Sequence, residues 1–105
     1  MVCWKLVRDR IGEELRGRSG VVVYRVGGEE LEGLLRAKIV EEALELAESG
    51  SVEEAADLLE ALYAWLRLRG VGVEWVEEVR RAKRRLRGGF EKGYVAVWLD
   101  GNCRG

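Results

Sequence analysis

The fold is decided by residues 29–69, which read EELEGLLRAKIVEEALELAESGSVEEAADLLEALYAWLRLR. Leucine, alanine and glutamate dominate both halves of this stretch, and these residues favour helices. A Ser-Gly-Ser turn separates the halves. Its last residue, Ser51, has Glu54 three positions later, which is the spacing of a capping box at the start of a helix. The pattern predicts helices over 29–48 and 52–69, and the short turn favours an antiparallel hairpin.

Glycine-rich turns divide the rest of the chain into shorter elements. We expect a short helix over 8–16 and a third amphipathic helix over 73–87. The β-branched and aromatic stretches 21–26 (VVVYRV) and 94–99 (YVAVWL) predict two strands, and their pairing would close the domain. The expected fold is a single mainly α domain over 1–105, with a helical hairpin, a third helix and a small two-stranded β element.

Composition limits the class of protein. The chain has 105 residues, of which 48% are hydrophobic and 35% charged, so it can bury one core. No apolar run approaches the ~20 residues of a membrane span, and the opening residues contain no apolar run typical of a signal peptide. We therefore expect a cytoplasmic protein without a membrane partner. Its net charge of −1 gives no broad basic field, so a nucleic-acid polymer is not an expected partner.

Missing residue types exclude several kinds of site. The chain has no histidine, which excludes Ser-His and Cys-His nucleophile systems in their usual form. Its two cysteines, Cys3 and Cys103, are too few for a cysteine zinc site. Glutamine is absent and asparagine occurs once, so thermolabile amides are few. This indicates a thermophile, with a GC-rich genome as the alternative explanation. In a hyperthermophile the two cysteines could form a disulfide.

Four carboxylates of the two long helices point towards the partner helix. Successive helical residues are about 100° apart. On the first helix this places Glu42 within the apolar stripe and Glu45 on its edge. On the second helix it places Glu54 within the stripe and Asp57 beside it. In an antiparallel hairpin Glu45 and Glu54 lie near the turn, and the other two acids lie one turn deeper.

Acids that converge in a partly apolar cleft need a neutralising partner, because a buried unpaired charge costs several kcal/mol. Oxygen ligands without nitrogen or sulfur favour a hard cation. We therefore predict that Glu42, Glu45, Glu54 and Asp57 bind Mg²⁺, with Mn²⁺ as a second candidate. The alternative is that these acids pair with arginines of a neighbouring element or subunit, which would make the chain a non-catalytic helical interaction module.

The acidic residues also resemble a family signature. Residues 41–45 (EEALE) and 54–57 (EAAD) are similar to the EExxE…ExxD motif of the MazG-like all-α NTP pyrophosphohydrolases. Residues 5–11 (KLVRDRI) and 87–92 (RGGFEK) are similar to the end segments of a small MazG-related subgroup, often labelled phosphoribosyl-ATP pyrophosphohydrolase-like. The resemblance spans most of residues 5–97. One departure is the short spacing between the two halves of the acidic motif, which implies short helices and a tight turn.

The resemblance implies hydrolysis of a nucleoside triphosphate between its α and β phosphates, giving a nucleoside monophosphate and pyrophosphate. House-cleaning of non-standard nucleotides is one role of such an activity. The nearest enzymatic alternative is phosphoribosyl-ATP pyrophosphohydrolase of histidine biosynthesis. The resemblance also implies that Glu42, Glu45, Glu54 and Asp57 are the Mg²⁺ ligands. Glu41, on the outer rim of the cleft, is a candidate for activating the attacking water, or it is a surface residue.

Phosphates also require cations. Lys38 projects on the same side of its helix as Glu45, so it is a candidate for catalysis and phosphate binding, or it neutralises the acids. Lys83 interrupts the apolar stripe of the third helix and is a second candidate, or a lysine whose stem covers apolar surface. Arg8 and Arg10 of the N-terminal motif are further phosphate-binding candidates.

The expected elements give thin cover for the apolar residues of the chain. Pairing two hairpins would complete a four-helix bundle. Enzymes of the family that the motif resembles also assemble as dimers or tetramers. We therefore expect a homodimer or homotetramer.

Overall fold

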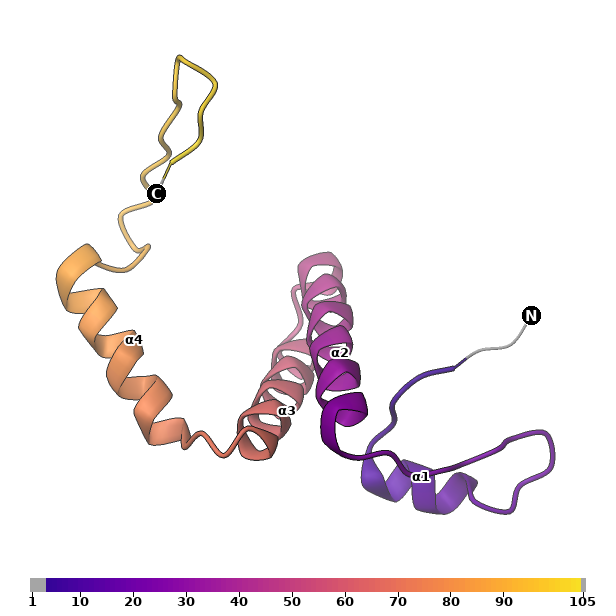
Figure 1. The fold of residues 1–105 in the computed structure, drawn as a ribbon. Coiled ribbons are helices and arrows are strands. Elements are labelled where there is room, and N and C mark those ends of the chain that lie inside the picture. Colours follow the sequence, from indigo (N-terminus) through magenta and orange to yellow (C-terminus); the bar gives the residue numbers. More distant parts are fainter. Residues whose placement is uncertain (1–3, 105) are drawn as a thin grey trace. The chain divides into compact units, whose positions relative to one another are not determined.

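The computed structural model describes residues 4–104, and four helices lie in this part of the chain. In chain order they are α1 (Asp9–Leu15), α2 (Gly28–Ser49), α3 (Val52–Leu68) and α4 (Val73–Arg87) (Figure 1). Each begins and ends within one residue of the predicted bounds, so the mainly α prediction is confirmed. The chain divides into two compact units, Met1–Val73 and Glu74–Gly105, which are described separately below. The expectation of a single domain stays a prediction.

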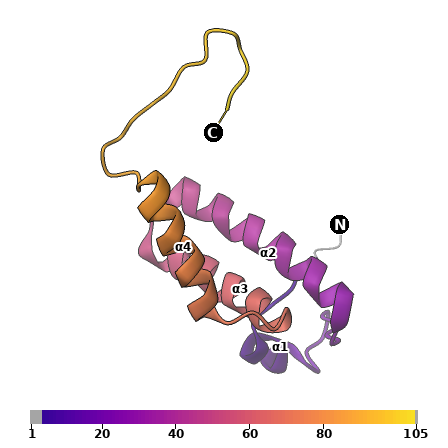
Figure 2. The same cartoon turned by 60° about the vertical axis from the view of Figure 1, so that its left-hand side comes forward.

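Helices α2 and α3 pack against each other and form the centre of the first unit (Figure 2). Trp65, near the end of α3, contacts Glu32, near the start of α2. Further along α2, Glu42 lies beside Glu54 and Asp57, near the start of α3. The start of α2 therefore faces the end of α3, and the later part of α2 faces the start of α3. The hairpin is antiparallel, as predicted.

The hairpin turn is set by two residues. Gly50 follows α2 in the left-handed conformation, with φ 63°, and its N–H donates to the Leu46 carbonyl at 2.8 Å. Glycine adopts this conformation without a steric cost, which is why it commonly ends helices. Ser51 then caps α3, because its hydroxyl accepts a hydrogen bond from the Glu54 N–H at 3.3 Å. The helix start predicted from the Ser51–Glu54 spacing is therefore confirmed.

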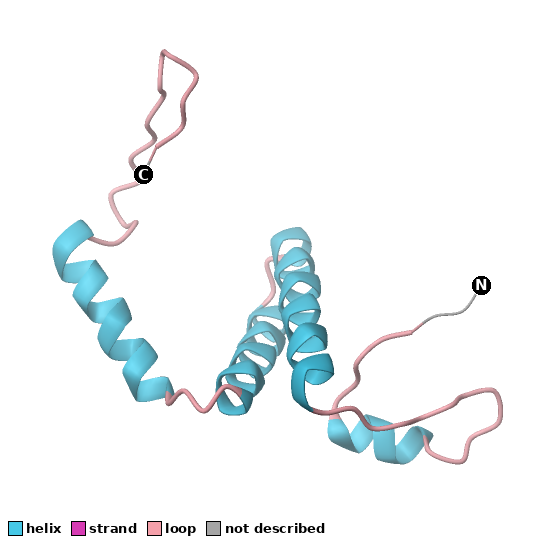
Figure 3. Ribbon diagram, in the orientation of Figure 1, coloured by secondary structure: helices cyan, strands magenta, loops and turns pink. Residues whose placement is uncertain are grey.

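The prediction of two strands is wrong. Residues 21–26 and 94–99 are loops, and no strand occurs anywhere in residues 4–104 (Figure 3). A strand becomes stable only when ladder hydrogen bonds join it to a neighbour. Within the part of the chain that the structure describes, no backbone hydrogen bond joins either segment to a neighbouring segment. The β propensity of these residues therefore does not by itself produce a strand.

The second unit consists of α4 and the segment that follows it. Glu77 accepts hydrogen bonds from Arg80 one turn later along α4, with the shortest at 2.8 Å, so the basic run of this helix is partly neutralised within the helix itself. Phe90 and Leu99 in the following segment are almost fully exposed. None of the helices in residues 4–104 has both the length and the apolarity needed to cross a membrane. The alternative of a Cys3–Cys103 disulfide involves Cys3, which lies outside the described residues.

A polar clasp closes the open end of the hairpin. Glu32 of α2 accepts hydrogen bonds from the Trp65 indole N–H of α3 at 2.9 Å and from Arg36 Nε at 2.7 Å. Arg69, just after α3, lies over the Trp65 ring at 5.2 Å from its centroid, and its guanidinium is 3.7 Å from Glu32. The hydrogen bond from Trp65 is the largest cause that lowers the pKa of the Glu32 carboxyl below its ordinary 4.5, followed by the hydrogen bond from Arg36 and the positive charges of Arg36 and Arg69.

The clasp predicts a pH-dependent effect of Glu32→Gln. A carboxyl whose pKa is lowered by folding stabilises the protein above its unfolded pKa, and this stabilisation is lost as the pH falls through the folded pKa. We therefore expect the variant to melt below the wild type at pH 7, and the difference in Tm to shrink once the pH falls below about 4.5. Thermal melts followed by circular dichroism between pH 3 and 8 would measure this.

The matched control is Glu60→Gln, which removes an exposed carboxylate from the same hairpin. A Tm difference for Glu32→Gln that stays constant across the pH range would show that the charge of Glu32 does not stabilise the hairpin.

Candidate metal centre

Three carboxylates converge between the two helices of the hairpin. Glu42 of α2 and Glu54 and Asp57 of α3 each offer an oxygen, and these oxygens lie within 4.8 Å of one another. Glu54 and Asp57 share a face of α3 because they are three residues apart. Three oxygen donors at this spacing suit a hard divalent cation such as Mg²⁺ or Mn²⁺.

Two oxygens of this cluster are buried without a partner. Glu42 is 6% exposed and is the one charged residue among the described residues that is buried. Its Oε2 atom and the Oε2 atom of Glu54 have no hydrogen-bond partner in the structure. An unsatisfied buried polar group costs about 1–3 kcal/mol, and more when it is charged. A cation between these carboxylates would satisfy both oxygens, so the residues present fit a metal ion.

The local structure of the turn leaves the Glu54 carboxylate available to the cluster. In a complete capping box, the side chain of the third residue bonds back to the N–H of the capping residue. Here the Ser51 N–H instead donates to the Ser49 hydroxyl at 3.2 Å. Ser49 therefore takes the place that Glu54 would otherwise fill. Sequence reasoning missed this role, although a serine two residues before a helix cap is a recognisable turn signal.

Lys38 lies beside the cluster, one turn before Glu42 on α2. Its Nζ atom is 3.3 Å from Glu42 Oε1 and 3.5 Å from Glu41 Oε1. Lys38 therefore forms ion pairs with two of these acids, as its alternative role of neutralising them requires. Glu41 has 38% of its side chain exposed, which agrees with its expected place on the rim of the cleft.

Arg8 also reaches the cluster, from the segment before α1. Its Nη2 atom donates to Asp57 Oδ1 at 2.6 Å. The sequence indicated Arg8 as a phosphate-binding candidate but gave no sign of this contact, which joins residues 49 positions apart. Arg10, the other candidate in the same motif, is exposed on α1, and no ion pair of Arg10 occurs among the described residues.

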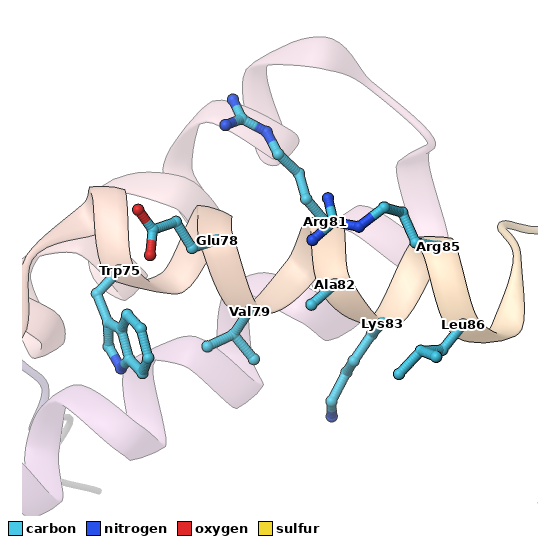
Figure 4. Close-up of a pocket in the computed structure, with 8 residues that line it drawn as sticks. All are labelled: Trp75, Glu78, Val79, Arg81, Ala82, Lys83, Arg85 and Leu86. Atoms are coloured by element: carbon cyan, nitrogen blue, oxygen red, sulfur yellow. The ribbon is translucent and has the colours of Figure 1, made fainter.

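Of the other predicted site residues, Glu45 is not one of the three converging acids and Lys83 lies in the second unit. Glu45 is half-buried one turn after Glu42, but it is not among the three acids whose oxygens converge. Lys83 belongs to the second unit, where it lines a shallow groove on α4 with Trp75, Val79 and Leu86 (Figure 4). The roles of both residues in ligand binding stay predictions.

Comparisons with protein-family models, with curated proteins and with solved structures give no match to this chain. Its function is therefore argued from the carboxylate cluster and from the sequence motifs that surround it.

The buried carboxylate predicts that Glu42→Met stabilises the metal-free protein. The substitution removes an oxygen without a partner, and Lys38 keeps Glu41 as its ion-pair partner. Because an unsatisfied buried polar group costs about 1–3 kcal/mol, its removal should raise the free energy of unfolding by up to this amount. Urea unfolding in the presence of EDTA would measure this, with Glu60→Gln as an exposed control expected to change stability by less than about 0.5 kcal/mol.

Destabilisation of the EDTA-treated protein by Glu42→Met would contradict the prediction. It would mean that the Glu42 carboxylate holds the hairpin together without a metal.

Proposed function

We propose that this chain is a Mg²⁺-dependent nucleoside triphosphate pyrophosphohydrolase of the MazG-like superfamily. The reaction would cleave the bond between the α and β phosphates and release a nucleoside monophosphate and pyrophosphate, with non-standard nucleotides as candidate substrates. The observation that carries the proposal is the pair of buried, unpartnered oxygens of Glu42 and Glu54 beside Asp57. The motif at residues 41–45 and 54–57 supports the reaction type.

The cluster would hold the metal through Glu42, Glu54 and Asp57, with Glu45 as a fourth ligand from the next turn of α2. Mg²⁺, or Mn²⁺ in its place, neutralises phosphate oxygens and lowers the pKa of bound water when it is present. The three converging acids come from two helices, so hairpin packing fixes the distances between them. This rigidity is what a site for an oriented phosphate chain requires.

The residues around the cluster have separate tasks in this proposal. Glu41 on the rim would orient the attacking water and accept its proton. Lys38 holds the Glu41 and Glu42 carboxylates through its ammonium group, and it would also bind a substrate phosphate. Arg10 and Lys83 are the other candidates for phosphate binding.

One observation favours a second candidate, the non-catalytic helical interaction module. Asp57 is neutralised by an arginine, as that alternative requires. Within the described residues no arginine pairs with the Oε2 atoms of Glu42 and Glu54, so this alternative needs an arginine from another subunit there. Phosphoribosyl-ATP pyrophosphohydrolase activity would use the same cluster with a larger substrate, so it differs from the main proposal in the substrate alone.

The proposal predicts Mg²⁺-dependent release of pyrophosphate from one or more nucleotides in a panel of canonical and modified triphosphates and phosphoribosyl-ATP. Elevated temperature is the appropriate condition for a composition typical of thermophiles. We expect Glu42→Gln to lower kcat by about 100-fold or more, because even residues that only support metal ligands contribute up to this factor. Glu60→Gln, the exposed control, should retain wild-type activity.

No turnover of any substrate, together with no effect of Mg²⁺ or Mn²⁺ on Tm, would favour the interaction module, because a metal bound by the folded state must raise Tm. Activity that survives in Glu42→Gln would place the site elsewhere.

We also propose that two hairpins associate, giving a homodimer or homotetramer. Apolar side chains of α2 and α3 remain exposed on the hairpin. Val40 is 59% exposed and Leu44 63% exposed on α2, and Val52 is 81% exposed on α3. A second hairpin over this surface would complete a four-helix bundle.

This association predicts that Leu44→Glu lowers the mass measured by light scattering at micromolar concentration, because a charge would be buried in the new interface. Circular dichroism should show unchanged helix content. A monomeric wild-type protein would contradict the association.

A further inference from the structure

The contact between Arg8 and Asp57 gives the acidic cluster an asymmetry. The Arg8 guanidinium pairs with Asp57 at 2.6 Å, whereas Glu42 and Glu54 each keep one oxygen without a partner. The paired acid is also the more accessible one, with 42% of its side chain exposed, compared with 8% for Glu42. A cation is therefore already present at the open side of the cluster, in the form of an arginine.

A divalent ion and this guanidinium compete for the same carboxylate. The Asp57 oxygen that completes the cluster lies within 4.8 Å of the oxygens of Glu42 and Glu54. An ion bound among these atoms would bring two positive charges close to Arg8. Coulomb repulsion would then weaken the Arg8–Asp57 pair even if each cation took a different oxygen of Asp57.

Arg8 can leave Asp57 without moving its backbone. Its carbonyl accepts a hydrogen bond from the Gly12 N–H at 2.9 Å, which fixes the residue at the start of α1. Its side chain is 58% exposed, so the guanidinium can rotate into solvent. A guanidinium presents a planar set of donors that matches a phosphate group.

We propose that Arg8 is a phosphate-binding residue released by the metal. In the metal-free site it occupies the Asp57 carboxylate, and after a divalent ion binds it turns to the phosphate chain of the ligand. This inference rests on the proposed function, because it requires both a metal at the cluster and a phosphate ligand. It implies that the metal binds before the phosphate chain, or together with it.

Arg8→Ala should therefore have opposite effects on the two ligands. Loss of the competing guanidinium should tighten binding of Mn²⁺ alone, by up to about fivefold for an exposed ion pair. Loss of the phosphate contact should weaken binding of pyrophosphate in excess Mg²⁺ by about tenfold or more. If Arg8 merely supported the fold, its substitution would weaken the binding of both ligands.

Isothermal titration calorimetry on the full chain measures both affinities without turnover. Arg16→Ala is the matched control, because Arg16 is an exposed arginine at the other end of α1. Arg8→Lys separates the two roles: it keeps a charge for Asp57, so Mn²⁺ affinity should stay near that of the wild type, while loss of the planar donor set should weaken pyrophosphate binding. Circular dichroism melts confirm that each variant folds.

Weaker or unchanged Mn²⁺ binding by a folded Arg8→Ala variant would overturn the inference, and so would unchanged pyrophosphate binding. The proposed function would survive both results, provided that the wild type binds Mn²⁺ and releases pyrophosphate. Failure of the wild type to bind Mn²⁺ would overturn the inference together with the proposed function.

Discussion

A carboxylate buried between two packed helices is the constraint on which the first unit depends. Glu42 is 6% exposed, and the buried apolar residues of the described chain are only Leu35, Ala61 and Leu66. A core of this size gives limited hydrophobic stabilisation, and an unpartnered carboxylate oxygen subtracts from it. The hairpin is therefore held at both ends by specific polar contacts. The cap at Ser51 fixes the turn, and the Glu32 clasp holds the open end.

The parts of this arrangement that depend on helical periodicity could be predicted from the sequence. In a helix the spacing between two residues along the sequence decides whether they share a face. The inward direction of Glu42, Glu54 and Asp57 therefore followed once the helix bounds were known. Glu54 had two competing roles, as a capping-box partner and as a member of the cluster. The Ser49 hydroxyl decides between them, because it occupies the Ser51 N–H.

The parts that depend on contacts between distant segments could not be predicted in the same way. Arg8 meets Asp57 across 49 positions, and no local pattern specifies that pairing. The strand predictions at 21–26 and 94–99 failed for a related reason. β propensity describes how well side chains suit a pleated sheet, whereas a strand also needs a neighbour that supplies hydrogen bonds.

The more buried acid and the more exposed acid of the cluster pair with different kinds of cation. Lys38 pairs with the deeply buried Glu42 from one turn away on the same helix, so α2 itself keeps this cation within reach of its acid. Arg8 pairs with the more exposed Asp57 through a long side chain from another segment. The inner cation is therefore local to its acid, whereas the outer one comes from a distant and more exposed side chain. In the proposed function, an ion from solvent would meet Asp57 first, because Asp57 is more exposed than Glu42, and would then reach the unpartnered oxygens of Glu42 and Glu54. In the proposed function, such an arrangement would offset part of the acidic charge in the metal-free hairpin and still leave oxygens of the cluster for a divalent ion.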